Sequence, residues 1–215
     1  MKVAILTSEN QWFIPYAKKL EKKIVSSKLI FNHLELTENY QIVFILSYHK
    51  IIPENILSLN KHNIVIHSSD LPQGKGWAPM FWQIIEGKNE IPFTMFEASN
   101  GVDNGDIYLQ KTLKLTGFEL HDELREKQAN FTIEMCLEFL QNYDLYKNPK
   151  PQIGKESFYK KRNKDSSELD IDKTIKEQFN LLRVVSNEDY PAFFEIENKR
   201  YVLKVEEMGG GSNID

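Results

Sequence analysis

The chain has 215 residues, of which 41% are hydrophobic and 27% are charged, with a net charge of -4. This length fits one domain, or one domain with a small appendage, and is enough to bury a full core. The single cysteine, Cys136, excludes a disulfide framework and a Cys-rich zinc site, and we expect no bound metal. The acidic balance argues against broad nucleic-acid binding, because neutralising phosphates requires an excess of cations. No apolar run reaches the length of a membrane span and the start lacks a signal-peptide pattern, so we expect a cytoplasmic protein without a membrane partner.

Strands and helices are predicted to alternate along the first two thirds of the chain. The predicted strands, which are short apolar runs typical of a sheet, are residues 2–7, 29–34, 42–46, 63–67, 91–97 and 106–113. Helical spacing of apolar residues predicts helices over 12–25 and 78–87, with a helical turn after Pro53. A capping box of Thr116 and Glu119 is expected to begin a long helix that ends near Tyr143. This alternation predicts an α/β fold with a Rossmann-like, mostly parallel sheet.

The pattern changes at residues 148–157, where prolines and a glycine indicate a linker. Beyond it, the apolar face of Ile175, Phe179, Leu182 and Val185 predicts a helix over 172–185. Residues 193–196 and 200–205 are expected to form a hairpin around the turn Glu197-Asn198-Lys199. The expected organisation is therefore a main domain (1–147), the linker (148–157), a small C-terminal helix-plus-hairpin extension (158–207) and a flexible tail (208–215).

Residues 67–79 form the densest cluster of chemically active residue types. His67 ends a predicted buried strand, and the carboxyl ends of strands line the ligand crevice in open α/β sheets. From these residues alone, a structural histidine and a functional one are equally good interpretations. The turn after the first strand contains no glycine, so we do not expect a dinucleotide site of the GxGxxG kind.

A second cluster, residues 101–106, is an acidic bend bracketed by glycines. The simplest interpretation is a hairpin turn, and the spacing of its acidic residues does not fit a calcium loop. The functional interpretation is that the Asp103 carboxylate orients a histidine, which is a common use of a carboxylate beside an imidazole.

Together the two clusters resemble the formyltransferases that use N10-formyltetrahydrofolate. The resemblance is carried by His67-Ser68-Ser69-Asp70-Leu71-Pro72, by Gly74 and Gly76, and by Asp103-Asn104-Gly105, with Asp103 36 positions after His67. It covers residues 1 to about 115. The resemblance implies the formyltransferase fold, a catalytic domain over 1–147, His67 and Asp103 as catalytic residues, and N10-formyltetrahydrofolate as cofactor.

One position departs from the family pattern. The family has an asparagine two residues before the histidine, where it helps to hold the formyl oxygen, but Val65 stands here. Asn63 is the nearest asparagine, and along an extended strand it lies about 13 Å from His67. We therefore do not expect Asn63 to substitute, and the sequence does not identify the group that does.

The resemblance also implies binding residues. The family's pterin-binding loop corresponds to Tyr48, His49, Lys50, Ile51 and Ile52, and the facing side of that pocket to Gly101, Val102 and Asp103. The C-terminal unit resembles the extension of formyltransferases that act on nucleotide-linked amino sugars. The substrate-binding residues implied by the family are Ser69, Lys75, Gly76, Trp77, Tyr159, Lys160, Arg162, Asn180 and Arg183.

Two of these groups have plainer interpretations. The basic run over 158–164 has the composition of a solvated surface. Asn180 and Arg183 lie three residues apart on one helix face, so they either contact substrate or hold the C-terminal unit against the main domain.

The expected reaction is attack of the amine of a nucleotide-linked amino sugar on the formyl carbon, a step of surface-glycan (lipopolysaccharide O-antigen) biosynthesis. His67 would stabilise the developing oxyanion and Asp103 would hold His67 in orientation. The alternatives are formylation of methionyl-tRNA or of a purine precursor, and a folate- or nucleotide-binding paralogue without turnover. The acidic charge and the small C-terminal unit favour the sugar over tRNA, and the edge of the hairpin would allow a homodimer.

Overall fold

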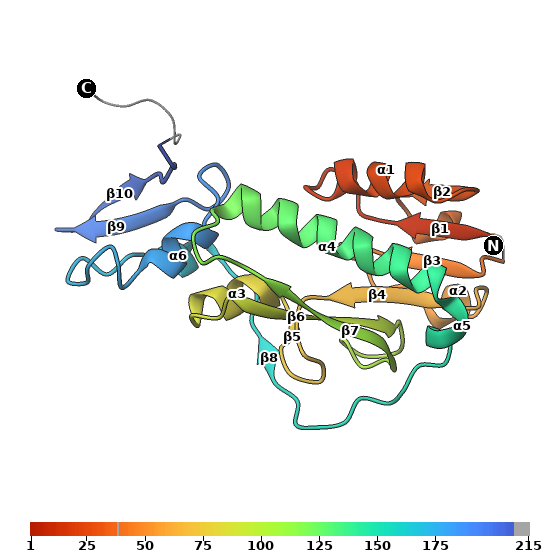
Figure 1. Ribbon diagram of the computed structural model, residues 1–215. Helices are drawn as coiled ribbons and strands as arrows, with labels where there is room; N and C mark the ends of the chain where they lie inside the picture. The colour runs from red at the N-terminus through yellow and green to blue at the C-terminus, as the bar shows by residue number, and fades with distance from the viewer. Residues whose placement is uncertain (38, 209–215) are drawn as a thin grey trace.

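The computed structural model describes residues 1–37 and 39–208, and its central feature is a six-stranded sheet in the order β2-β1-β3-β4-β6-β7 (Figure 1). Its strands are β1 (Val3–Leu6), β2 (Ser27–Ile30), β3 (Ile42–Ile45), β4 (Asn63–His67), β6 (Glu90–Glu97) and β7 (Ile107–Lys114). Strands β2, β1, β3 and β4 pair in parallel, whereas β6 is antiparallel to both β4 and β7. The predicted α/β fold with a mostly parallel sheet is confirmed.

Helices cover both faces of this sheet. They are α1 (Ile14–Lys23), α2 (Glu54–Leu57), α3 (Pro79–Ile85), α4 (His121–Gln141), α5 (Tyr143–Tyr146) and α6 (Phe179–Val184), with short 3-10 turns at His33–Glu35 and Lys164–Ser167. Successive strand residues point to opposite faces, so in β1 Val3 and Ile5 pack with α1, α3 and α4, whereas Ala4 and Leu6 pack with α2. Both faces of β1 are buried, which explains its unbroken apolar run. Among the described helices, none combines the length and the apolar character needed to cross a bilayer.

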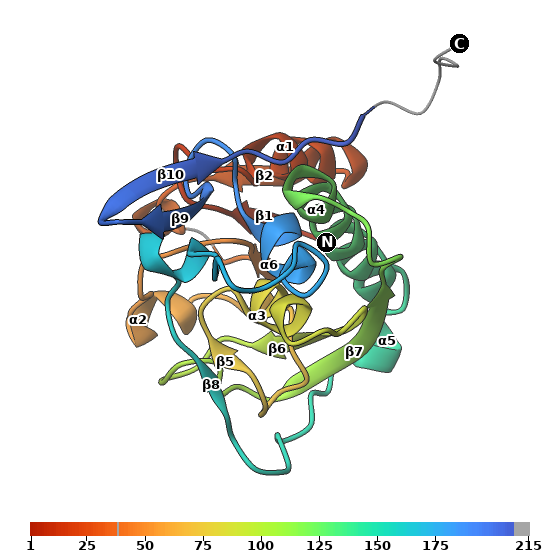
Figure 2. The ribbon, with the colours of Figure 1, turned by 90° about the vertical axis from the view of Figure 1, so that its left-hand side faces the viewer.

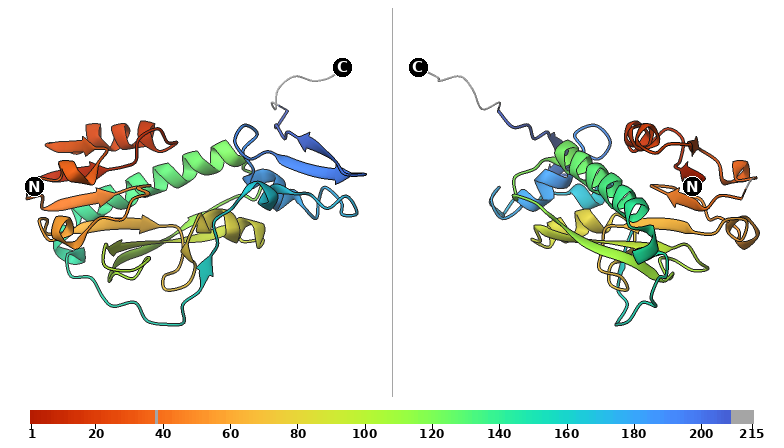
Figure 3. Two further views of the ribbon diagram at one scale, coloured as in Figure 1. Left: turned by 180° about the vertical axis from the view of Figure 1, so that it is seen from behind. Right: turned by 45° about the vertical axis from the view of Figure 1, so that its right-hand side comes forward.

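The C-terminal unit lies at one end of α4 (Figures 1 and 3). It contains α6 and an antiparallel hairpin of β9 (Ala192–Ile196) and β10 (Lys199–Leu203), beside each other in Figure 2. The hairpin prediction is confirmed, but its turn has two residues: Glu197 and Asn198 take φ values of 49° and 64°, as a type I′ turn requires. Of the tail predicted over 208–215, residues 209–215 lie outside the described part of the chain.

The predicted helix over 172–185 is wrong in its first half, because the chain is helical only over Phe179–Val184 and Ile175 is 61% exposed. The Gln178 side chain accepts a hydrogen bond from the Asp170 N–H (2.7 Å) and donates one to the Asp170 carbonyl oxygen (3.0 Å). Such side-chain bonds to the backbone compete with helix formation and hold this segment in turns.

Helix α4 begins at His121, later than the capping box of Thr116 and Glu119 predicts. The Glu119 carboxylate does accept hydrogen bonds from the N–H groups of Thr116 (2.8 Å) and Gly117 (3.1 Å), but these bonds close a separate turn. The helix is capped instead by Glu123, whose carboxylate accepts from the Leu120 N–H (3.0 Å).

Arg183 joins the C-terminal unit to the main domain. It has no exposed surface, and its guanidinium donates to Asn180 (3.0 Å), to Asn89 (2.6 Å) and to Glu119 (3.5 Å). Burial alone would raise the pKa of Glu119, but hydrogen bonds from Thr116 and Gly117 outweigh it and lower that pKa to about 2. The ionised form of Glu119 is therefore the form that stabilises this junction.

We predict that Glu119→Gln destabilises the protein most above pH 5. The folded-state pKa lies below the ordinary value of 4.5, so the stabilisation is present above that value and is lost as the pH falls toward 2. Urea unfolding of wild type and variant at several pH values between 7 and 3 measures the difference in free energy of unfolding. Glu126→Gln, at an exposed position of α4, is the control, and a difference that stays constant across this range would contradict the prediction.

Candidate functional site

His67 is the last residue of β4 and lies at the carboxyl end of the parallel strands. Its Nε2 is 3.0 Å from the Gly74 carbonyl oxygen and 3.6 Å from Asp103 Oδ2. Both neighbours are acceptors, so Nε2 carries the ring proton. Nδ1 has no hydrogen-bond partner in the described chain, which leaves this nitrogen available to a ligand.

Asp103 reaches His67 from the bend between β6 and β7. Its backbone φ is +52°, a left-handed conformation that aspartate tolerates better than most residues. Its Oδ2 also accepts a hydrogen bond from the Gly76 N–H at 2.9 Å. At Gly76 φ is +96° and an added Cβ would lie 2.5 Å from the Tyr159 carbonyl oxygen, so only glycine permits this approach.

Residues 148–157, the predicted linker, form an extended strap along one side of the molecule (Figure 1). The Gln152 amide donates to the carbonyl oxygens of Asp103 and Gly105, both at 2.8 Å. The Ser157 hydroxyl accepts from the Gly74 N–H at 2.8 Å. The strap thus contacts both loops that surround the His67 imidazole. The division of the chain into 1–147, 148–157 and 158–207 stays a proposal.

Lys75 is 1% exposed, although it is among the predicted substrate-binding residues. Its ammonium lies 2.5 Å from a Glu156 carboxylate oxygen in the strap and also donates to the Asn104 side chain. Its backbone lies in β5 (Lys75–Gly76), which pairs in parallel with β8 (Phe158–Tyr159), a pairing that the sequence did not predict. Lys75 therefore joins the Asp103 bend, the strap and β8. Ser69, another predicted substrate-binding residue, is also buried, with 1% of its surface exposed.

Aromatic and basic residues lie next to this loop. Trp77 is 47% exposed and stacks on His49, with ring centroids 6.3 Å apart and planes 7° apart. The Lys161 ammonium lies 4.8 Å from the centre of the Trp77 ring. Trp77 and His49, predicted to bind substrate and cofactor, are thus brought together, and Lys161, from the basic run over 158–164, lies beside them.

Of the remaining predicted substrate residues, Tyr159 lies beside Gly76 through the pairing of β8 with β5. Tyr159 stacks on Trp82 and its hydroxyl donates to Glu86 (2.9 Å), and the Lys160 ammonium lies 6.0 Å from the Trp82 ring centre. Arg162 donates to the carbonyl oxygens of Ser166 and Val184. Asn180 contacts the buried Arg183, so this pair holds the C-terminal unit, and a substrate contact stays a prediction that their burial does not support.

The predicted pterin-binding segment, residues 48–52, is an exposed loop, with Ile51 92% exposed, whose two ends contact the core. Tyr48, Ile52, Val65 and Ala98 are partly buried against one core cluster, which places this segment beside β4 and the chain leading to Gly101 and Val102. The backbone polar groups of residues 50–52 have no hydrogen-bond partner in the described part of the chain. Unpaired backbone groups beside an apolar surface are what a flat heterocycle with several donors and acceptors requires.

Val65 lies on the same face of β4 as His67 and is part of this apolar set. Asn63 is buried at the opposite end of β4, where its amide donates to the Leu57 carbonyl oxygen (3.0 Å) and to Glu97 (3.3 Å). Asn63 therefore does not substitute for the family asparagine, as expected.

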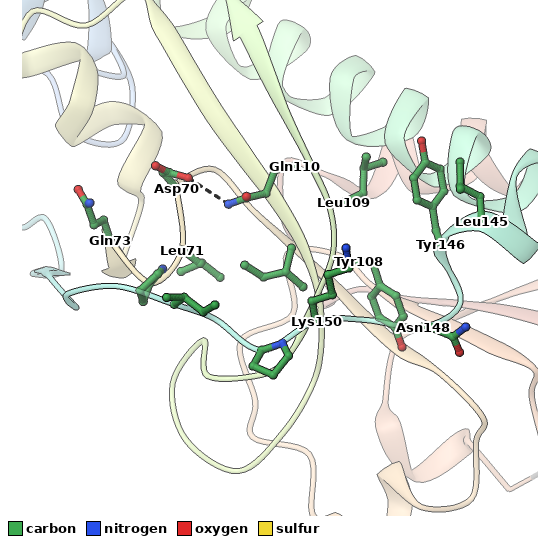
Figure 4. Close-up of a pocket in the computed structure, with 14 residues that line it drawn as sticks. Asp70, Leu71, Gln73, Tyr108, Leu109, Gln110, Leu145, Tyr146, Asn148 and Lys150 are labelled. Carbon is green, nitrogen blue, oxygen red and sulfur yellow. Dashed lines mark hydrogen bonds between the residues drawn. The ribbon is translucent and has the colours of Figure 1, made fainter.

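A separate groove of about 600 Å³ lies between β7, the strap and α5 (Figure 4). Its lining includes Leu71, Leu109, Tyr146 and Lys150, and Asp70 accepts a hydrogen bond from Gln110 (3.0 Å) at its side. None of the predicted catalytic or cofactor-binding residues line it. The groove and the His67 site are therefore different places on the molecule.

Comparison with known proteins assigns the chain to a family. The model of the family described as formyl transferase matches residues 2–140. The chain belongs to the formyl transferase family. Over 147 residues it is 29% identical to the methionyl-tRNA formyltransferase of Thermodesulfovibrio yellowstonii, covering 67% of this chain and 48% of that protein. Over 112 residues it is 37% identical to that of Rickettsia bellii, covering 52% and 36%. The chain thus spans about half the length, or less, of these curated relatives.

Solved structures of two formyltransferases and of HypX share its fold. The methionyl-tRNA formyltransferase from Clostridium thermocellum has a TM-score of 0.79 at 22% identity, covering 99% of this chain and 96% of that one. A sugar N-formyltransferase from a Shewanella species has a TM-score of 0.69 at 17% identity, covering 98% and 100%. HypX from Aquifex aeolicus, in complex with tetrahydrofolic acid, has a TM-score of 0.77 at 17% identity, covering 95% and 37%. At these identities the similarity concerns the fold.

We predict that Gln152→Ala loosens the Asp103 bend. The change removes both hydrogen bonds from the strap to this bend, so amide hydrogens of residues 101–106 should exchange faster than in wild type. Hydrogen exchange read by mass spectrometry measures this, with Gln141→Ala at the exposed end of α4 as the control. Unchanged exchange in the bend of Gln152→Ala would show that the strap does not hold it.

Proposed function

We propose that the protein transfers a formyl group from N10-formyltetrahydrofolate to the amine of a nucleotide-linked amino sugar. The observation that carries the proposal is the His67–Asp103 pair, with Nε2 3.6 Å from Oδ2, at the strand edge beside the 48–52 segment. Family membership supports the formyl chemistry. A location in the cytoplasm, a role in surface-glycan biosynthesis and pairing of two copies through the edge of β10 belong to the same proposal.

In this proposal, one set of residues holds the folate and another orients the His67 imidazole. When bound, N10-formyltetrahydrofolate supplies the formyl group, and residues 48–52 with Gly101 and Val102 would hold its ring system. Asp103 fixes the orientation of the His67 ring through Nε2, and the Gly76 N–H fixes the Asp103 carboxylate. In the neutral ring, His67 Nδ1 accepts a proton from the acceptor amine, and in the imidazolium that results the Nδ1–H donates to the negatively charged formyl oxygen.

Val65 limits how that charge is stabilised. An amide side chain at this position would add a donor next to His67, but valine adds only apolar surface. His67 therefore has to supply more of the stabilisation of the developing oxyanion, because one hydrogen-bond donor fewer faces it.

Two observations support a sugar acceptor. The chain carries a net charge of -4, which disfavours a polyanionic tRNA. The exposed Trp77, stacked on His49 and close to Lys161, offers a flat surface and a cation suited to a nucleotide. Sugar N-formyltransferase structures with the same fold are in accord with this choice.

Methionyl-tRNA is the second candidate acceptor, since the curated relatives carry that activity in their names. An assay with N10-formyltetrahydrofolate separates the two candidates. Purified protein is offered a panel of nucleotide-linked amino sugars and, separately, methionyl-tRNA, and the mass gain of one formyl group is measured. We expect formylation of at least one amino sugar. Formylation of methionyl-tRNA alone would overturn the sugar proposal, and no formylation with retained folate binding would indicate a binding paralogue.

We predict that His67→Ala and Asp103→Ala each lower turnover by at least about 100-fold while the protein stays folded, because a positioned proton-transfer group contributes about this much. The measurement is the rate of formyl transfer to the acceptor that the panel identifies, together with thermal unfolding of each variant. Asp106→Ala, an exposed aspartate of the same bend, is the matched control and should retain normal turnover. Near-normal turnover of either His67→Ala or Asp103→Ala would remove the assignment of that residue.

A further inference from the structure

Arg125, near the start of α4, is held between two aromatic rings. Its guanidinium carbon lies 4.5 Å from the centre of the Trp12 ring and 4.3 Å from that of Phe81. Trp12 belongs to the turn between β1 and α1, and Phe81 to α3, which follows the His67 loop. Rings over a guanidinium hold its orientation and leave its hydrogen-bonding edge as the part that can receive a partner.

The charge of Arg125 is not neutralised by the protein. Within the described residues, no carboxylate lies within ion-pair distance, and the one hydrogen bond is from Nη1 to Gln128 Oε1 at 3.2 Å. Nε and Nη2 have no hydrogen-bond partner in that same part of the chain. Three nitrogen atoms of a fixed, planar donor group are thus served by a single neutral acceptor.

A second guanidinium lies nearby and has the same deficiency. Arg162 donates only to backbone carbonyl oxygens, those of Val184 and Ser166 (3.3 Å each), and its buried Nε has no partner in the described structure. Burial, and then the charge of Arg162, lower the pKa of Arg125 to about 10, so both groups remain cationic at neutral pH. Burial also lowers the pKa of His121, and both arginines lower it further, whereas the hydrogen bond between His121 and Asp122 (2.9 Å) raises it.

Two like charges that act on each other, with no carboxylate bound to either guanidinium, are unfavourable, and an anion bound by them removes that cost. In a chain with a net charge of -4, the many acidic side chains offer partners, yet none is used here. Arginine is the side chain best suited to bidentate contact with phosphate oxygens. The unneutralised pair therefore has the features of a binding site for an oxyanion.

The cluster borders the proposed active site. Lys161, adjacent to Arg162 in sequence, lies over Trp77, which stacks on His49 of the proposed folate segment. Trp12, His49 and Trp77 all follow the carboxyl ends of β1, β3 and β4, the edge at which His67 lies. A substrate whose amine is at His67 would therefore extend toward the two arginines.

We infer that Arg125 and Arg162 form an anion-binding site that receives the phosphate groups of the acceptor substrate. This inference rests on the proposed function for the identity of the substrate. The same chemistry would also suit the carboxylates of the glutamate tail of folate, so the experiment has one arm for each source.

The first arm uses inorganic pyrophosphate as the probe, titrated calorimetrically into the full-length protein at low salt. We expect wild type to bind it, and Arg125→Gln and Arg162→Gln to bind at least 10-fold more weakly. Arg200→Gln makes the same change of charge at a 60%-exposed side chain of β10 and should bind as wild type does. Thermal unfolding followed by tryptophan fluorescence reports whether each variant is folded. If Arg125→Gln does not fold, Arg125→Lys, which keeps the charge but not the planar fork, should still weaken binding.

The second arm uses 5-formyltetrahydrofolate, a stable folate, on the same proteins. We expect its affinity to change less than twofold in Arg125→Gln and Arg162→Gln. A loss confined to the folate would assign the site to the folate carboxylates, and wild-type pyrophosphate affinity in both arginine variants would overturn the inference, as would a wild type that does not bind pyrophosphate.

These outcomes are distinguishable from failure of the proposed function. If no amino sugar is formylated but pyrophosphate binding still depends on Arg125, the anion site stands and the amino-sugar proposal does not. If an amino sugar is formylated with an unchanged KM in Arg125→Gln, the function stands and the site does not.

Discussion

The contacts of one carboxylate, that of Asp103, bring the essential parts of this molecule together. Its Oδ2 lies 3.6 Å from His67 Nε2 and accepts a hydrogen bond from the Gly76 N–H. The imidazole comes from β4, the N–H from the loop that follows, and the carboxylate from the bend between β6 and β7. Strand β6 runs antiparallel to β4, so its last residue, Glu97, lies opposite Ile64 near the start of β4. The bend after β6 therefore has to run back along the sheet to bring Asp103 to His67, and contacts with other segments hold it there.

The strap and the C-terminal unit supply that support. Gln152 binds the backbone on both sides of Asn104, and Lys75 joins the Asn104 side chain to Glu156. The strap is in turn anchored because the chain beyond it continues into β8 and then into the unit that Arg183 fixes to the main domain. Residues far from His67 in sequence therefore contribute to the geometry around it.

The buried cations of this region fall into two groups: those with a carboxylate or amide partner in the protein and those without a carboxylate partner. The buried cations Lys75 and Arg183 have carboxylate or amide partners, Glu156 for the first and Asn89 with Glu119 for the second. Arg125 and Arg162 have no carboxylate partner in the described residues. A cation that already has its partner holds the fold, whereas one without a partner has binding energy left for a ligand. This difference is the basis on which we propose the anion site at the second pair.

The sequence by itself determined the α/β class and the location of His67 at a strand end, because apolar runs and turn residues are local. The pairing of His67 with Asp103 was expected only from the resemblance to a family, because the two residues lie 36 positions apart. The sequence did not determine the pairing of β5 with β8, the bonds of the strap, or the shortened helix at Phe179–Val184. Those depend on contacts between residues distant in the chain, or on side-chain bonds such as those of Gln178 that outweigh helical spacing. The same holds for the charged residues. Lys75 and Arg183 are buried with carboxylate partners, whereas Arg125 has none in the described residues, and both burial and partners are known only from the tertiary structure.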